Sequence, residues 1–278
     1  MGEIQWEVRF CRIAAGERWY YLKYMKSGAL HEKRVPLSQL AIGCSGFSYD
    51  HWRGTFYPDD LPQVKWFGHY CSAFSSVELN VTFYRLPKPM TFEKWWRETP
   101  DGFVFTIKGS RFITHVKRLI DPEEPLERFF AAALRLGEKL GAVLWQFPPG
   151  FAEDVDRLRQ FLEFLDRYPV RNALEFRNRS WLNEEVFALC REHNAALCMA
   201  DWPVFIDDLP LTADFVYLRR HGRNGDYATR YDHGELAHDA RRIRGYLDSG
   251  RDVFIYFNND ARGYAPQNAL ELGEMLAE

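Results

Sequence analysis

The chain has 278 residues, 46% of them hydrophobic, which is enough to bury the core of one large α/β domain. Its formal net charge of −3 excludes the overall positive field of many nucleic-acid-binding proteins, so any affinity for phosphate has to be local. The N-terminus lacks a basic start followed by an apolar run, and no stretch approaches the ~20 apolar residues of a membrane span. We therefore expect a cytoplasmic protein with no membrane partner.

The cysteines support the same compartment. They are odd in number and irregularly spaced, which argues against a framework of disulfides and for a reducing environment. They are Cys11, Cys44, Cys71, Cys190 and Cys198.

Residues 1–37 differ in pattern from the rest of the chain. Two β-prone runs, EVRFCRI and ERWYYLKYM, are separated by Ala-Ala-Gly, which predicts a β-hairpin. The segment SGALHEKR that follows is typical of a solvated linker. We predict an N-terminal extension over 1–37 and a main domain over 38–278.

Eight short apolar runs follow, nearly all separated by amphipathic helical patterns. The predicted strands are 40–44, 76–79, 103–107, 141–145, 172–176, 195–200, 215–218 and 253–257. The predicted helices are 62–74, 87–98, 122–140, 152–168, 183–193, 235–247 and 267–276, whereas 203–213 is short and proline-marked and is expected to be a loop.

Nearly continuous apolar strands between helices are typical of a parallel sheet covered on both faces, and eight such repeats predict an α/β fold, the (β/α)8 TIM barrel. A doubly wound sheet is the alternative. The loop after the first strand, CSGFSYDHWRG, does not have the glycine spacing of that fold's phosphate-binding turn.

Polar side chains stand at the carboxyl ends of these strands, where a TIM barrel carries its active site. The predicted catalytic residues are Glu78, Glu175, His115 and Asp201. The predicted substrate-binding residues are Asn80, Tyr84, Lys108, Arg111, Gln146, Arg177, Trp181, Arg219, His221, Asn258, Asn259 and Asp260.

Two carboxylates inside apolar strands, Glu78 and Glu175, are the candidates for general acid and base. Burial should raise their pKa values unless Arg or Lys lies close. Lys108, Arg177 and Arg219 come from three strands, and we expect them to converge on one anion. This pattern favours an enzyme, such as a hydrolase or lyase, acting on an anionic small molecule, phosphate-bearing or sugar-like, or on a nucleic-acid fragment.

Other interpretations of the same residues stay open. One is a non-catalytic nucleic-acid-binding barrel that stacks bases on its Trp-rich loop, which includes Trp52. Another is a glycoside hydrolase that uses the carboxylate pair. No cofactor is predicted. A divalent metal is the alternative, but its candidate ligands lie on separate strands without an HxxxH or HxH signature. These candidate ligands are His115, His221, Glu78, Glu175 and Asp201.

Six segments of the sequence resemble the YecE-like family, also named domain of unknown function 72. They are GCSGFSYDHWRGTFYP, SSVELNVTFYRLP, FTIKGSRFITH, GAVLWQFPPGF, EFRNRSW and YFNNDARGYAPQNA. The resemblance spans about residues 41–277 and leaves out 1–37. It implies a TIM barrel and no established activity. Such barrels resemble endonuclease IV, which implies nucleic-acid binding, but this chain lacks the row of metal-binding histidines of a trinuclear zinc endonuclease.

Overall fold

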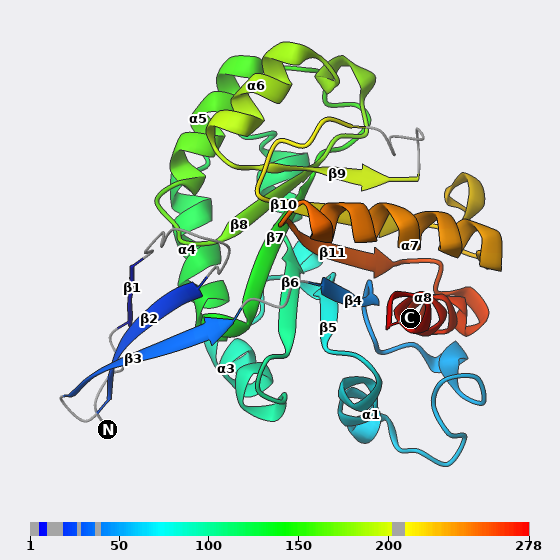
Figure 1. Cartoon of the computed structure of the whole chain (residues 1–278). Coiled ribbons are helices and arrows are strands. Elements are labelled where there is room, and N and C mark those ends of the chain that lie inside the picture. The colour runs from blue at the N-terminus through cyan, green and yellow to red at the C-terminus, as the bar shows by residue number, and fades with distance from the viewer. Residues whose placement is uncertain (1–5, 10–18, 27–28, 37–39, 202–208, 278) are drawn as a thin grey trace. The chain divides into compact units, whose positions relative to one another are not determined.

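The computed structural model describes residues 6–9, 19–26, 29–36, 40–201 and 209–277. The chain forms two compact units, residues 1–39 and 40–278 (Figure 1).

The first unit contains a three-stranded antiparallel sheet. Its strands, in the order β1-β2-β3, are β1 (Trp6–Arg9), β2 (Trp19–Lys26) and β3 (Ala29–Pro36). The two β-prone runs pair in antiparallel register, while the Ala-Ala-Gly connection between them lies outside the described residues. The expected linker was wrong, since most of it forms β3, which pairs with β2 along its whole length. Strand pairing uses backbone groups, so a segment rich in charged residues can still form a strand.

The second unit is the predicted barrel, which confirms the fold. Its parallel strands are β4 (Leu40–Cys44), β5 (Ser76–Leu79), β6 (Val104–Lys108), β7 (Leu140–Gln146), β8 (Arg171–Glu175), β9 (Ala196–Ala200), β10 (Phe215–Arg220) and β11 (Asp252–Phe257). They are ordered β4-β11-β10-β9-β8-β7-β6-β5.

A tyrosine hydroxyl helps to close the ring between β4 and β5, which share only one isolated backbone bridge, Ser45 to Glu78. The hydroxyl of Tyr70 accepts from the Cys44 amide and donates to the Ser76 carbonyl, each at 2.8 Å. A side chain at Gly43 would have no room, because its Cβ would lie 2.2 Å from the Ser76 carbonyl oxygen. Glycine thus allows the close approach that the tyrosine then bridges.

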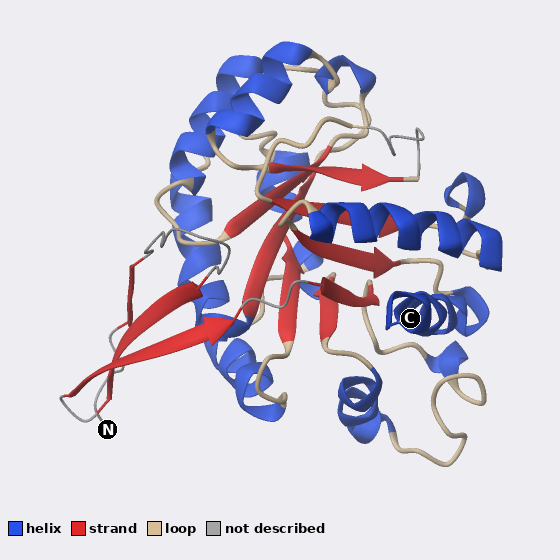
Figure 2. Ribbon diagram, in the orientation of Figure 1, coloured by secondary structure: helices blue, strands red, loops and turns tan. Residues whose placement is uncertain are grey.

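Helices surround the strands (Figure 2). The α-helices are α1 (Trp66–Ala73), α2 (Val81–Tyr84), α3 (Pro89–Glu98), α4 (Glu123–Ala133), α5 (Val155–Leu165), α6 (Glu184–Glu192), α7 (His233–Asp248) and α8 (Tyr264–Ala277). The short 3-10 helices are η1 (Asp50–Trp52), η2 (Gln63–Lys65), η4 (Leu134–Lys139), η5 (Arg179–Trp181), η6 (Arg223–Gly225) and η7 (Ala261–Gly263), and η3 (Phe112–Val116) is a π-helix.

Side-chain caps define where three of these helices begin. The Asp154 carboxylate accepts from the Arg157 amide at the start of α5, and Asn183 caps α6 in the same way. Asp232 and Glu235 form a capping box at α7. Between β9 and β10, where a loop was expected, residues 202–208 lie outside the described part and 209–213 form no helix.

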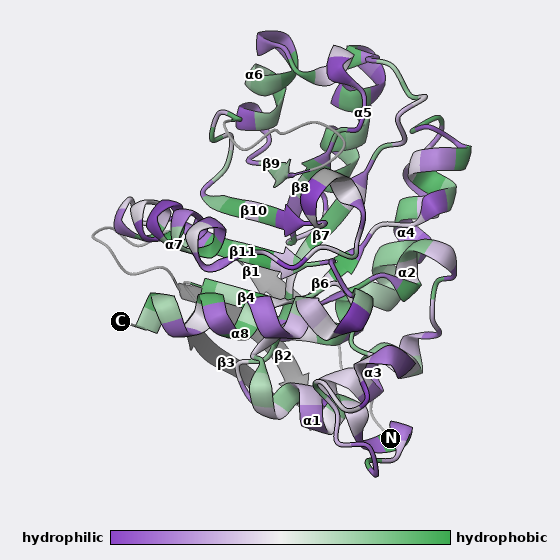
Figure 3. Ribbon diagram, turned by 90° about the vertical axis from the view of Figure 1, so that its right-hand side faces the viewer, coloured by the Kyte–Doolittle hydropathy of each residue, from purple (hydrophilic) through white to green (hydrophobic). Residues whose placement is uncertain are grey.

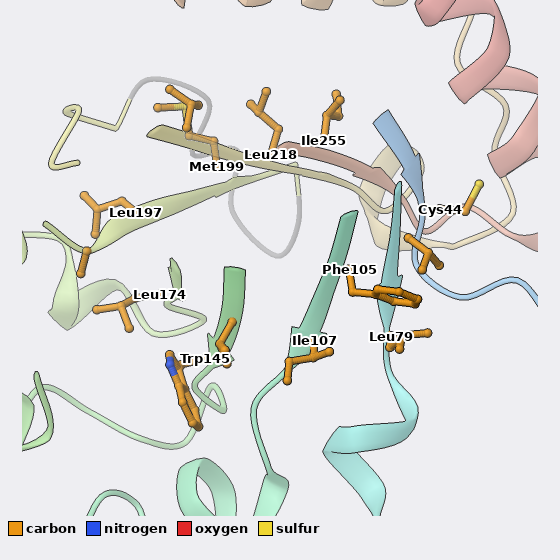
Figure 4. Close-up of a cluster of buried hydrophobic side chains, with 14 of the residues drawn as sticks. Cys44, Leu79, Phe105, Ile107, Trp145, Leu174, Leu197, Met199, Leu218 and Ile255 are labelled. Carbon is orange, nitrogen blue, oxygen red and sulfur yellow. The ribbon is translucent and has the colours of Figure 1, made fainter. Parts of the chain in front are cut away.

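Alternating side chains divide the barrel into an inner and an outer layer. Outward residues pack against the helices and radiate from the ring of strands in Figure 4, among them Leu79, Phe105, Trp145, Leu174, Leu218 and Ile255. Inward residues form a separate cluster in which alanines of β4, β7, β8 and β9 face large aromatic side chains of β10 and β11. This interior is filled rather than hollow, as in other barrels of eight strands.

Candidate functional site

The same alternation aims polar side chains into the barrel mouth at the carboxyl ends of the strands. Phe215 and Tyr217 of β10 belong to the interior cluster, so Arg219, two residues further on, also faces inward. In Figure 3, β10 changes from hydrophobic along its body to hydrophilic at its end. The inward positions at the other strand ends are Ser45, Glu78, Lys108, Gln146 and Glu175, all buried.

Arg219 lies at the centre of this mouth and joins the two predicted acid–base residues. Its Nε donates to Oε2 of Glu78 (3.1 Å), its Nη2 to Oε1 of Glu78 (2.8 Å) and its Nη1 to Oε2 of Glu175 (2.6 Å). Longer contacts run from Nη2 to Ser45 Oγ (3.4 Å) and from Nη1 to His221 Nε2 (3.3 Å). Burial opposes its charge, but the two carboxylates raise the pKa of Arg219.

Glu78 is fully buried and saturated with donors. Besides Arg219, the Ser45 hydroxyl donates to Oε1 at 2.5 Å and the Tyr217 hydroxyl donates to Oε2 at 2.6 Å. Four donors from three residues hold this carboxylate in one orientation, so it acts as the anchor of the cluster rather than as a group turned toward solvent.

Glu175 carries a second buried ion pair. Its Oε1 accepts from Nε of Arg177 at 2.7 Å, while Oε2 faces Arg219. Burial acts to raise the pKa of Glu175, but Arg177 and Arg219 outweigh it and hold the pKa well below its usual range. A general acid has to carry a proton at working pH. An ionised Glu175 fits the base rather than the acid of the predicted acid–base pair, because the arginines that the prediction named as its exception lie close.

His221 is buried beside the guanidinium and is held on both ring nitrogens. Its Nδ1 lies 3.0 Å from the side-chain amide of Asn258, and Nε2 faces Arg219. Burial, reinforced by the charge of Arg219, lowers the pKa of His221 well below its ordinary value. The lowered pKa favours a neutral ring, which can accept a hydrogen bond at only one of its two nitrogens.

Lys108 differs from the other cations of the mouth. Its side chain is 9% exposed, its Nζ lies 4.3 Å from the centre of the Phe83 ring, and the described residues provide no hydrogen-bond or ion-pair partner. Burial, together with the charge of Arg219, lowers the pKa of Lys108 to about 8, although Glu175 and Glu78 oppose the shift. The Thr82 hydroxyl donates to the Lys108 carbonyl at 2.6 Å and fixes the backbone at the end of β6.

Gln146 ends β7, the strand next to Lys108. Its side chain is buried, and within the described ranges its amide contacts no donor or acceptor. It pairs in register with Glu175 of β8, so it lies between the lysine strand and the carboxylate strand. An ammonium and an amide of adjacent strands thus lie at the mouth without a hydrogen-bond partner among the described residues, as does Oδ1 of Asn80.

The rim of the mouth beside Lys108 is formed by the loops after β5 and β6. His115 lies in the π-helix η3 and packs edge-on against Phe83, with ring centroids 5.0 Å apart. Burial, then Lys108 and Arg111, lower the pKa of His115 to about 4. The side chain of Arg111 is exposed, that of Tyr84 is 77% exposed, and the Asn80 amide donates to the Ser45 carbonyl at 3.3 Å.

Three predicted site residues instead fix loops. Oδ1 of Asp201 accepts from the backbone amide of His221 (2.8 Å), and Oδ2 accepts from the Tyr231 hydroxyl. Asn259 is fully buried and donates to the Thr229 carbonyl and to the Asn268 side chain.

Asp260 joins the loop after β11 to the loop after β4. Its backbone carbonyl accepts from Trp52 Nε1 and contacts His51 Nε2. In this conformation both carboxylate oxygens of Asp201 and the amide nitrogen of Asn259 bind the chain itself, whereas Oδ1 of Asn259 is buried without a hydrogen-bond partner among the described residues.

Two tryptophans are also part of the packing. Trp181 is fully buried, stacks on Phe176 at 5.0 Å, and donates to the Phe151 carbonyl. Trp52 is equally buried. Neither ring has a face open to a base or a sugar, so in this conformation Trp181 cannot make the predicted ligand contact and Trp52 cannot serve the stacking alternative.

Ser45 and Tyr217 both donate to Glu78 and belong to the site, but neither is among the residues predicted from the sequence. A signal for each was present. Ser45 directly follows the first strand, and Tyr217 is two residues before Arg219 on the same strand, so it shares the inward face. Deeper in the barrel, the hydroxyl of Tyr256 lies 2.7 Å from Ser76 Oγ and 2.8 Å from Thr106 Oγ1.

The divalent-metal alternative does not fit this geometry. Within the described residues, no three His, Cys, Asp or Glu side chains gather closely enough to hold an ion. The guanidinium of Arg219 occupies the place between Glu78 and Glu175 where a shared cation would bind. Cys44, Cys71, Cys190 and Cys198 are free thiols.

Comparison with known proteins decides the family. A family model described as "Protein of unknown function DUF72" matches residues 41–278. The chain belongs to the DUF72 family. The UPF0759 protein YunF of Bacillus subtilis is 30% identical over 269 residues, which cover 84% of this chain and 94% of YunF. The UPF0759 protein YecE of Escherichia coli K12 is 31% identical over 97 residues.

Solved structures of DUF72 proteins share this barrel. A crystal structure of a DUF72 family protein from Thermotoga maritima superposes with a TM-score of 0.75 at 32% identity and covers 86% of this chain and 99% of that one. A DUF72 family protein from Enterococcus faecalis reaches 0.71 at 22% identity, covers 86% of this chain and 96% of that one, and supports the fold alone. The family description names no activity. Among the described residues, no helix is both long and apolar enough to cross a membrane.

Proposed function

We propose that this DUF72 barrel is a cytoplasmic enzyme that binds an anionic small molecule at its mouth and acts on it by general acid–base chemistry. The observation that carries the proposal is Lys108, a lysine that is only 9% exposed and whose ammonium has no hydrogen-bond or ion-pair partner among the residues described. Burying a cation without a partner costs stability, and such a cost is typical of binding and catalytic sites.

The charges of the mouth favour an anion. Glu78 and Glu175 are balanced by Arg177 and Arg219 through ion pairs of 2.6 to 2.8 Å. Lys108 is the surplus cation of this five-residue cluster. Arg219 is already hydrogen-bonded to the two carboxylates. Lys108 alone, rather than the three predicted cations together, would therefore bind the anion.

Of the acid–base groups of the mouth, His115 was among the predicted catalytic residues, whereas Lys108 was predicted only to bind substrate. With a pKa of about 8, Lys108 can donate and accept protons near neutral pH, and His115, with a pKa of about 4, is a neutral imidazole there. Glu175 stays ionised. A glycoside hydrolase needs one carboxyl with a raised pKa as its acid, and the lowered pKa of Glu175 counts against that alternative.

Ligand-induced stabilisation tests the proposal. Thermal unfolding of the purified chain would be followed with inorganic phosphate, pyruvate and a series of sugar phosphates. We expect at least one anion to raise the melting temperature of the natural protein and to leave Lys108→Met unchanged. Lys94→Met, which alters an exposed lysine of α3, is the control and should respond like the natural protein.

Two outcomes would contradict an anion site at Lys108, and a third would favour another function. If no small anion stabilises the protein, or if Lys108→Met responds as strongly as the natural protein, the anion site is not at Lys108. Tight binding of a single-stranded oligonucleotide, weakened steeply by salt and without any effect of small anions, would favour the nucleic-acid-binding alternative instead.

A further inference from the structure

The nitrogen of Lys108 is placed as a nucleophile as well as a cation. It projects inward from the end of β6 with no hydrogen-bond partner among the described residues, and it stands over the face of Phe83. An apolar face and nearby cations are the surroundings in which a lysine amine loses its proton and becomes reactive. A lysine that served only structure would be paired with Glu78 or Glu175, but both accept from arginines instead.

We propose that Lys108 forms an imine with the carbonyl carbon of an anionic carbonyl compound, that is, a 2-oxo acid or a phosphorylated aldehyde or ketone. This inference rests on the proposed function, because it assigns a substrate class and a covalent step to the same site.

The step balances without any further reagent. The neutral amine of Lys108 attacks the carbonyl carbon, forming a C–N bond while the oxygen takes up a proton. The resulting carbinolamine loses that oxygen as water, and the nitrogen gives up its proton as the C=N bond forms. One water is released, and nothing is oxidised or reduced. Protonation of the imine then leaves a cation in the place of the former ammonium.

Neighbouring residues suit both parts of such a substrate. The Gln146 amide, on the adjacent strand, can donate to the carbonyl oxygen as negative charge develops on it. The positive charges of Arg177 and of exposed Arg111 attract the carboxylate or phosphate of the substrate. Both arginines help to lower the pKa of His115, which indicates that their field reaches the rim of the mouth.

Every charged group that acts on the amine belongs to the same cluster. Burial and the charges of Arg219 and Arg177 favour the neutral amine, while Glu175 and Glu78 favour the ammonium, and the pKa is lowered to about 8. At pH 7 about a tenth of Lys108 is then the free amine, compared with roughly one part in a few thousand for an ordinary lysine.

Reductive trapping tests the imine. The full chain would be incubated at pH 7 with pyruvate, glyoxylate or dihydroxyacetone phosphate in the presence of sodium cyanoborohydride, which reduces the imine to a stable secondary amine. Peptide mass spectrometry then gives the rate of modification at each lysine. We expect at least one probe to modify Lys108 about tenfold or more faster than the exposed Lys94 in the same sample.

One variant and one competitor secure the assignment. Lys108→Arg keeps a positive charge but cannot form an imine, so modification at that position should be lost while Lys94 is modified at its former rate. Inorganic phosphate should slow the trapping at Lys108 alone. If Lys108 and Lys94 are modified at equal rates with all three probes, the imine proposal is wrong. The anion-binding proposal would still stand if small anions stabilise the natural protein but not Lys108→Met, so the two failures are distinguishable.

Discussion

Arg219 grips Glu78 through two parallel hydrogen bonds, from Nε to Oε2 at 3.1 Å and from Nη2 to Oε1 at 2.8 Å. Its third nitrogen reaches Glu175, so one guanidinium holds two buried carboxylates from opposite parts of the chain. Such a pair costs desolvation, but breaking it from one side costs more, because the remaining charges stay buried without a partner.

Arg219→Met should therefore destabilise the fold at pH 7 by about 3–5 kcal/mol. Urea unfolding measures the change. Arg191→Met removes an exposed ion pair with Glu184 and should cost at most about 1 kcal/mol. Equal losses in the two variants would contradict the central role of Arg219.

Lys108→Met should stabilise the protein by roughly 1–3 kcal/mol at pH 7, because it removes a buried ammonium that has no partner among the described groups. The pH dependence has a definite sign. Below about pH 8 the folded and unfolded proteins both carry the Lys108 proton, and the folded state bears the full free-energy cost of burying the charged ammonium. Between pH 8 and the unfolded value the folded state has lost this proton, so stability rises with pH.

The difference in the free energy of unfolding between Lys108→Met and the natural protein should thus become smaller above pH 8. Urea unfolding at pH 7, 8.5 and 10 follows it. A variant that is less stable than the natural protein at every pH would mean that the lysine is a structural group rather than a strained one.

His115 should titrate with a pKa of about 4 in NMR spectra of its ring protons. Since Lys108 is one cause of that shift, Lys108→Met should move the pKa of His115 upward. The unfolded chain binds the His115 proton more readily than the folded one. The free energy of unfolding therefore decreases as the pH falls from the ordinary pKa of a histidine toward 4. An unchanged pKa in Lys108→Met would show that the two groups do not share one field.

Tyr70→Phe tests how the barrel closes. Losing the hydroxyl leaves the Cys44 amide and the Ser76 carbonyl buried without this partner, and we expect a loss of about 1–3 kcal/mol by urea unfolding. Tyr84→Phe, at an exposed tyrosine, is the control and should change stability little. A loss no greater than in the control would mean that β4 and β5 need no such bridge.

The sequence by itself determined the barrel. Apolar runs such as 215–218 and 253–257 are continuous because parallel strands are buried on both faces, and the helices between them have one apolar side, so strand count and class follow from local pattern. It also determined which strand ends are polar, and that Glu78, Lys108, Glu175 and Arg219 face one mouth, since side chains alternate along a strand.

Only the tertiary structure decided how these residues pair. Arg219 could have faced an anion, as the sequence indicated, but its contacts depend on distances between side chains of different strands, and these favour Glu78 and Glu175. For the same reason burial alone predicted a raised pKa for Glu175, whereas two guanidiniums lower it. Lys108 was one cation among three in the sequence. Packing left it buried and without a partner among the described residues, because Glu78 and Glu175 already accept hydrogen bonds from Arg219 and Arg177.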